Sequence, residues 1–238
     1  MRRILATCYG ILGAALFALP AAAAQPLKIT VYGGTGMIGQ RIVHEALERG
    51  DLVTVIVRDP AEEAAHHPHL TVRKGDVLDS MQVAHSAAGQ DVIVSAVSFR
   101  KPPEPGAYVR AARSLIEALR SLGPKAPRLI VVGGAGSLTD SAGKLAAERI
   151  PVAYRGEVLG QKDALDYYRT VKDVSWTYFS PAFSISPGQR TGKFRLGADE
   201  LVSDAHGDSR ISAEDYAVAV LDEAEKPTHT HRRFTIGY

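Results

Sequence analysis

Three evenly spaced glycines are the residues with the clearest chemistry in the sequence. Gly33, Gly36 and Gly39 lie between an apolar run and a stretch of helical spacing, the context expected of a strand, a turn and a helix. The first glycine allows a tight turn, Gly36 lets a diphosphate reach the backbone, and Gly39 allows close packing of helix on strand. The segment therefore predicts a dinucleotide site with the phosphates on the helix N-terminus. It also includes Thr35, Met37 and Ile38.

The end of the second expected strand indicates which nicotinamide cofactor binds. An NAD site would place Asp or Glu here to hold the ribose hydroxyls, whereas Val57 is followed by Arg58. A guanidinium can pair with a 2′-phosphate, so Arg58 favours NADPH, and NADH is the alternative because Asp59 comes next. Arg41 and Lys74 are either helpers at the phosphate or ordinary surface charges.

Loops after three other strands are expected to complete the cofactor site. Asp76 follows the third strand and is predicted to accept from the adenine amine, and Ala96-Val97-Ser98 should flank the ribose and nicotinamide. Ser180-Pro181-Ala182 follows the sixth strand and should line the nicotinamide. Phe183 then offers a ring to a flat acceptor, although a core position is an equally good interpretation.

The elements that position these loops alternate along the chain, which predicts a doubly wound parallel sheet. A helix from 213 is expected to begin with the capping pair Ser212 and Asp215. No long linker or repeat divides the chain, so one domain over 25–238 is predicted, its last third forming a small substrate cap. The expected strands are 27–32, 52–57, 70–73, 91–95, 128–132, 175–179 and 233–238, and the helices are 37–49, about 80 onward, 108–122, 154–170 and 213–225.

The first 24 residues read as a secretory signal peptide. Arg2 and Arg3 precede an apolar run, and small residues at 22–24 suit a cleavage site. A membrane anchor is less favoured because Pro20 breaks the short run, while the arginine pair partly matches a twin-arginine signal. We therefore expect an exported, periplasmic protein with no membrane attachment after cleavage. The only cysteine, Cys8, lies in this segment, so the mature chain has no thiol.

Composition excludes several other classes of function. The chain has 45% hydrophobic and 23% charged residues, as globular domains do. Without Arg2 and Arg3 it carries 26 basic and 26 acidic residues, which argues against a nucleic-acid partner. The absence of asparagine excludes N-glycosylation. A metal site is not expected: the histidines at 66, 67, 69, 229 and 231, with Glu62 and Glu63, read as surface residues.

Several stretches together resemble a known family over residues 27–238. Besides GGTGMIG and VIVRDP they are LIVVGGAGSL at 129–138, SWTYFSPA at 175–182, PGQRTGKFR at 187–195, ISAEDYAVA at 211–219 and RFTIGY at 233–238. The chain resembles the atypical short-chain dehydrogenases/reductases that bind NAD(P)H, in particular their NADH-flavin reductase branch. The resemblance implies a Rossmann fold, a reduced nicotinamide cofactor and a flavin, quinone or similar conjugated acceptor. The export signal departs from these proteins, which as a rule are cytoplasmic.

The wider superfamily uses a serine, a tyrosine and a lysine four residues after the tyrosine. The resemblance implies Ser137 and Tyr154 as the catalytic pair here, but Val158 stands in the lysine position. Lys162 is expected to face solvent. Tyr168 and Lys172 have the right spacing at the wrong edge of the sheet, and we expect them at the surface.

Two functions from different classes remain open. In the first, hydride passes from NADPH to a stacked small-molecule acceptor, water supplies the proton, and the lost lysine is tolerable. In the second, the protein binds NAD(P)H without turnover, as a redox sensor would. The sequence allows a homodimer without requiring one.

Overall fold

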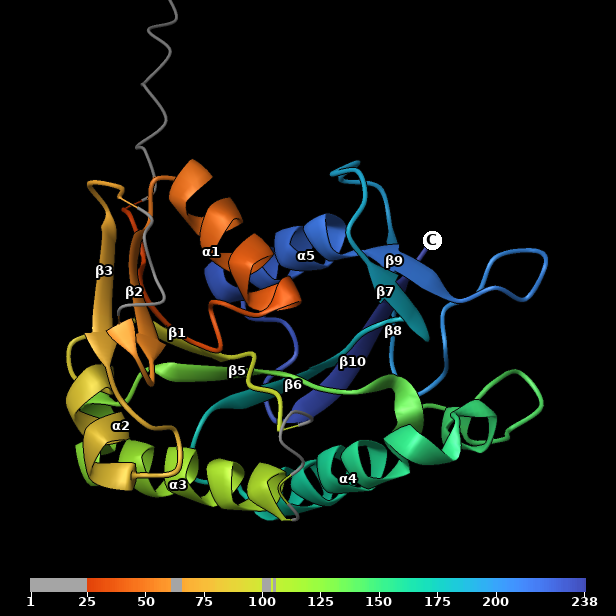
Figure 1. The fold of residues 1–238 in the computed structure, drawn as a ribbon, viewed down its shortest axis with the longest axis horizontal. Helices are drawn as coiled ribbons and strands as arrows, with labels where there is room; N and C mark the ends of the chain where they lie inside the picture. Colours follow the sequence, from red (N-terminus) through yellow and green to blue (C-terminus); the bar gives the residue numbers. More distant parts are fainter. Residues whose placement is uncertain (1–24, 61–65, 100–103, 105) are drawn as a thin grey trace, which may run out of the picture.

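Residues 25–60, 66–99, 104 and 106–238 are described by the computed structural model, and the predicted signal peptide lies outside them. In this part of the chain one sheet has eight strands, all parallel except the last (Figure 1). This confirms the predicted doubly wound parallel sheet. In spatial order the strands are β3 (Leu70–Lys74), β2 (Leu52–Val57), β1 (Lys28–Tyr32), β4 (Val92–Ser95), β5 (Arg128–Val132), β6 (Trp176–Ser180), β10 (Arg232–Gly237) and β8 (Arg195–Gly197).

Helices cover both faces of this sheet because successive strand side chains point to opposite sides. Ile29 and Val31 face α1 (Met37–Glu48) and α5 (Ala213–Glu225). Tyr32 and Ile93 face α2 (Ser80–Ala87), α3 (Ala107–Leu122) and α4 (Arg155–Thr170). Figure 1 shows these two helical layers above and below the strands. Among the described residues, no helix is both long and apolar enough to cross a membrane.

Tyr168 is a core residue, so its predicted surface position is wrong. Its side chain is 1% exposed, and its ring lies 5.7 Å from that of Trp176 and 6.1 Å from that of Tyr178. It faces inward because it continues the buried stripe of Ala164 and Leu165 along α4. Lys172 is exposed, as expected.

Strand order places a crevice at the glycine turn. β1 pairs with β2 on one side and β4 on the other, so the chain changes direction across the sheet at β1. Connections on opposite sides leave space beyond the carboxyl ends of such strands, where open α/β proteins bind ligands. The predicted cofactor loop begins at this point.

Short elements in the second half of the chain form a small cap on the main core. Its two strands, β7 (Ser184–Ser186) and β9 (Arg210–Ser212), pair with each other. Three short turns precede α4: η3 (Ala135–Ser137), η4 (Ala146–Arg149) and η5 (Val152–Tyr154). A further turn, η2 (Gly123–Lys125), follows α3. Leu138, Ala146 and Leu201 form a small apolar cluster against which Phe183 packs. Phe183 therefore joins the cap to the sheet.

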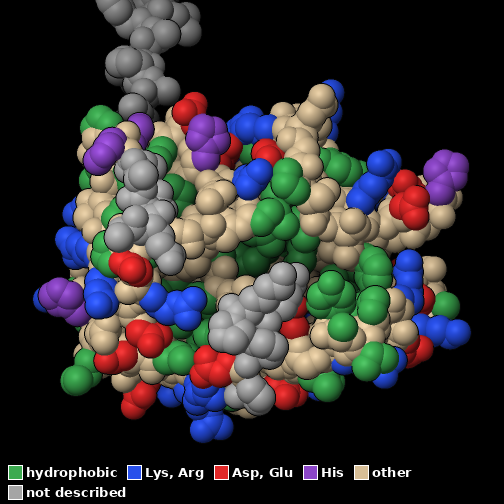
Figure 2. All heavy atoms as spheres, viewed as in Figure 1, with side chains coloured by type: hydrophobic (Ala, Val, Ile, Leu, Met, Phe, Trp, Pro, Cys, Tyr) green, Lys and Arg blue, Asp and Glu red, His purple; other side chains and the backbone are tan. Residues whose placement is uncertain are grey.

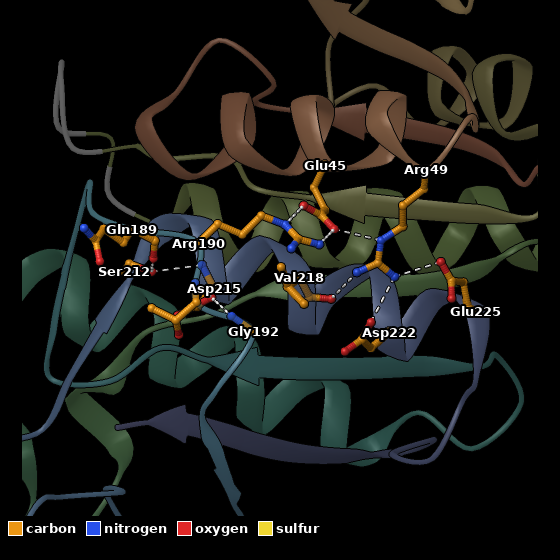
Figure 3. A network of polar contacts seen from close by, with 11 residues as sticks. Glu45, Arg49, Gln189, Arg190, Gly192, Ser212, Asp215, Val218, Asp222 and Glu225 are labelled. Atoms are coloured by element: carbon orange, nitrogen blue, oxygen red, sulfur yellow. Dashed lines mark hydrogen bonds and ion pairs between the residues drawn. The ribbon is translucent and has the colours of Figure 1, made fainter.

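Buried acids fasten residues 187–193, here called the strap, onto α1 and α5 (Figure 3). Glu45 of α1 is 4% exposed and accepts two hydrogen bonds from Arg190, at 2.7 and 2.8 Å, and one from Arg49 at 2.9 Å. Asp215 of α5 is fully buried and accepts from the backbone amides of Thr191 and Gly192. Burial raises the pKa of Asp215, but the hydrogen bonds from the strap outweigh it and leave the pKa below its usual value. Ser212 caps α5, as predicted, by accepting from the Asp215 amide.

Replacing Glu45 by glutamine should flatten the loss of stability in acid. Its hydrogen bonds from Arg190 hold the pKa of Glu45 below the ordinary 4.5 despite burial. Such a carboxylate stabilises the fold above its ordinary pKa, and this contribution disappears as the pH falls through the folded value. We expect the wild-type melting temperature, followed by circular dichroism, to fall more steeply than that of E45Q between about pH 5 and pH 3. Parallel curves would contradict this role of the Glu45 charge.

Candidate functional site

A cleft of about 650 Å³ opens where the glycine turn meets the carboxyl ends of β4, β5 and β6. Figure 2 shows hydrophobic side chains inside and beside the hollow on this face. Its walls come from five parts of the chain that are far apart in sequence. The lining residues include Gly36, Met37 and Ile38; Ala96, Val97 and Ser98; Val132 to Gly136; Tyr154, Glu157, Val158 and Gln161; and Pro181, Ala182, Phe183 and Ile185.

The glycine turn has the geometry that a dinucleotide needs. Gly33 has a φ of +76°, and a Cβ there would lie 2.4 Å from the Ala96 carbonyl oxygen. A Cβ at Gly39 would lie 2.0 Å from the Gly33 oxygen, so helix and strand approach closely only with glycine. Gly36 is the N-cap of α1 and no side chain caps it, which leaves the first amides of the helix available to an anion. Thr35 is exposed in the same turn.

The structure brings the other nicotinamide-side predictions to the same cleft, with one exception. Ala96, Val97 and Ser98 face Pro181 and Ala182 around it. The exception is Ser180, which is fully buried beneath the cleft. Phe183 fits both interpretations made from the sequence, since it lines the cleft and packs on the cap cluster. The Arg149 guanidinium lies 4.6 Å from the centre of its ring.

The adenine-side residues lie at the ends of β2 and β3. Arg58 directly follows β2 and is exposed. Arg41 is committed elsewhere, because it pairs with Glu214 at 3.1 Å and donates to the Met37 carbonyl. Lys74 is exposed at the end of β3, and exposed Asp76 accepts from the Leu78 amide. Among the described residues, Arg41 is therefore the one of these three cations that is held in an ion pair.

The start of α4 forms one wall of the cleft. Val158, which stands where the superfamily has a lysine, packs there against a neighbouring loop. Tyr154 is 46% exposed and lines the cleft. Val158 packs so closely on the preceding loop that a Cβ at Gly136 would lie 2.3 Å from its Cγ1. Lys162 is held by Asp166 at 2.7 Å and faces solvent, as expected.

Two cleft residues on α4 were missed by sequence reasoning. Gln161 packs directly against Gly134, because a Cβ at Gly134 would lie 1.8 Å from the Gln161 Oε1. Glu157 accepts a hydrogen bond of 3.2 Å from the Tyr108 hydroxyl. Burial raises the pKa of Tyr108, which keeps its hydroxyl protonated as a donor. The sequence does contain a signal for such residues, the second glycine cluster at 133–136. Glycines in a cluster let side chains from another element approach the backbone closely.

Ser137 is not brought into the cleft with Tyr154. Its hydroxyl accepts a 2.8 Å hydrogen bond from Arg233, whose buried guanidinium also pairs with Asp199. Ser137 is absent from the residues that line the cleft in the described part of the chain. The contact indicates a structural tie between the cap and β10.

Two of the histidines considered for a metal make other contacts. His229 interacts with the buried Glu223 at 2.8 Å, and His231 with the Val174 carbonyl at 2.8 Å. Glu62 and Glu63 lie outside the described residues. Within residues 25–60, 66–99, 104 and 106–238, no three metal-ligating side chains form a group.

Comparisons with known proteins match this architecture over nearly the whole chain. A family model described as NAD(P)H-binding matches residues 33–227. A Burkholderia pseudomallei structure, provisionally described as an exported protein, is 41% identical with a TM-score of 0.77 and covers 89% of this chain and 100% of its own. A Bacteroides thetaiotaomicron structure, provisionally an epimerase, is 35% identical with a TM-score of 0.81, covering 90% and 98%. A Streptococcus pneumoniae TIGR4 structure, provisionally an NADH-flavin reductase, is 30% identical with a TM-score of 0.77, covering 89% and 99%.

Proposed function

Because the chain belongs to the NAD(P)H-binding family, we propose that it is a reductase that passes a hydride from NADPH to a flavin, quinone or similar conjugated acceptor. The observation that carries the proposal is the shared cleft: the glycine turn and the aromatic wall at Phe183 open onto the same space. When bound, the reduced nicotinamide supplies the hydride. The protein supplies the geometry that brings the two rings together.

The cofactor side of the proposal rests on α1 and Arg58. The uncapped amides in the first turn of α1, which follow Gly36, bind the diphosphate, and the helix dipole adds to this attraction. Arg58 pairs with the 2′-phosphate, which makes NADPH the preferred cofactor and NADH the weaker one. Ala96 to Ser98 and Pro181 to Ala182 then enclose the nicotinamide end.

The acceptor side rests on an apolar wall. Phe183, Ile185, Met37 and Ile38 all line the cleft, and this apolar lining favours a flat, conjugated molecule over a polar one. The name of the Streptococcus pneumoniae relative supports a flavin among such acceptors.

Tyr154→Phe should lower kcat by less than about tenfold. A tyrosine that donates the essential proton normally contributes a factor of roughly 100 or more. Here Val158 removes the lysine partner, and Tyr154 is exposed enough for water to act in its place. Steady-state NADPH oxidation with a quinone measures this, and a loss above about 100-fold would restore Tyr154 as the general acid.

The direct test is NADPH oxidation by residues 25–238 with and without flavin mononucleotide (FMN). Consumption that needs both the protein and the flavin supports the reductase. The second candidate, a binding protein without turnover, is favoured by the packed Val158 and by the loss of Ser137 to Arg233. Tight NADPH binding without consumption of any flavin or quinone would select it.

Export and assembly are separate parts of the proposal. The predicted signal and the provisional name of the Burkholderia pseudomallei relative both support transport to the periplasm. Fractionation of cells that express the whole chain tests this, with a variant lacking residues 1–24 as the control. Light scattering on residues 25–238 tests whether the chain forms the homodimer that the sequence allows.

A further inference from the structure

The strap directly continues the segment that forms the acceptor wall. Phe183 and Ile185 line the cleft, β7 ends at Ser186, and the strap starts at the next residue. Met37 and Ile38, at the beginning of α1, line the same cleft. The position of the strap relative to α1 therefore helps to determine how far apart the two walls lie.

Consecutive strap residues are anchored, and a side chain makes the direct link to α1. Gly188 donates to Glu214 at 2.7 Å, Gln189 accepts from Ser212 at 2.8 Å, and Thr191 and Gly192 donate to Asp215 at 2.7 and 2.8 Å. All three of these partners belong to α5 or its cap. Arg190 instead reaches Glu45, in the last turn of α1, with two parallel hydrogen bonds (Figure 3).

The two arginines that bond to Glu45 differ in how exposed their side chains are. The Glu45 side chain is 6% exposed, and that of Arg49 is 19% exposed, whereas Arg190 is 56% exposed. Arg49 also binds Asp222, Glu225 and the Val218 carbonyl, and so ties α1 to α5. If Arg190 is removed, Glu45 keeps Arg49 as its partner. Loss of Arg190 therefore removes the direct link between the strap and α1 without leaving a buried charge unpaired.

We propose that Arg190 is a positioning residue for the acceptor, which fixes the strap, and with it Phe183 and Ile185, at a set distance from the dinucleotide helix. The identity of the acceptor rests on the proposed function, but the clamp does not. Two stacked rings exchange a hydride only near van der Waals contact, so a small widening of the cleft is costly. Two parallel hydrogen bonds define such a distance better than a single contact.

The test compares R190A, R190K and R49A in residues 25–238. For R190A we expect the KM for FMN to rise about tenfold with the Kd for NADPH nearly unchanged, and the melting temperature to fall less than in R49A. R190K restores the charge but not the paired geometry, so it should recover only part of the loss. R49A should lower the melting temperature and leave the KM for FMN unchanged. An unchanged KM in R190A, or an equal rise in R190A and R49A, would overturn the positioning role.

Hydrogen exchange of residues 184–193 gives a readout that does not depend on activity. Faster exchange of this segment in R190A than in R49A supports the clamp, and equal exchange overturns it. If the wild type consumes no NADPH with any acceptor, the proposed function fails while the exchange result still decides whether Arg190 holds the strap.

Discussion

Gly36→Asp should abolish cofactor binding without weakening the fold. Gly36 has φ −74° and ψ 165°, which any residue adopts, and a Cβ would meet only the Gly33 oxygen at 3.3 Å. Aspartate is also a favoured N-cap, so the new carboxylate satisfies the free amides of α1 itself. The same carboxylate occupies the anion site and repels the diphosphate. We expect the Kd for NADPH to rise at least roughly 100-fold, with a melting temperature equal to or above that of the wild type.

Gly36→Ala is the matched control for this variant. It adds the Cβ without the charge, so calorimetric titration should show less than about tenfold loss of NADPH affinity. Gly39→Ala should instead lower the melting temperature, because its Cβ would lie 2.0 Å from the Gly33 oxygen. NADPH binding by G36D at wild-type affinity would show that the diphosphate does not use this helix end.

Arg58→Ala should remove the preference for NADPH. The 2′-phosphate is the one group that distinguishes the two cofactors, and Arg58 is the cation that directly follows β2. A hydrogen bond to a charged group contributes about 1.5 kcal/mol or more, which corresponds to roughly tenfold in affinity. We therefore expect the Kd for NADPH to rise about tenfold and that for NADH to stay within about twofold.

Arg232→Ala controls for the general loss of positive charge. Arg232 is exposed at the start of β10, at the opposite edge of the parallel sheet. Its removal should change neither Kd, and the ratio of the two affinities can be measured by nicotinamide fluorescence. Equal weakening of NADPH and NADH by R58A would assign Arg58 to surface charge and remove the NADPH preference.

The sheet could be predicted from the sequence because its strands are continuous apolar runs separated by helical spacing. The glycine turn, which directly follows the first strand, indicated that the cleft lies at the carboxyl ends of the strands. The short strands β7, β8 and β9 could not be predicted, since three residues carry too little pattern and their pairing depends on distant segments. Tyr168 was wrongly predicted at the surface from its spacing to Lys172. The helical pattern it shares with Leu165 instead indicates a buried position.

Backbone-defined parts of the site were easier to predict than side-chain partners. The loops after β4 and β6 reach the cleft because topology requires it. Ser137 has the expected place in the chain, but its hydroxyl meets Arg233, which is 96 residues away. Arg41 likewise meets Glu214, 173 residues away. Such pairings depend on tertiary packing, which sequence spacing does not describe.

The central claim is that one cleft holds cofactor and acceptor together, and anaerobic mixing of residues 25–238 with NADPH and FMN tests it most directly. The nicotinamide and flavin absorbance bands are followed in the same sample. We predict that both bands disappear in equal amounts and at the same rate, and that neither changes with G36D. NADPH binding with no loss of either band would contradict the claim and leave a cofactor-binding protein without turnover.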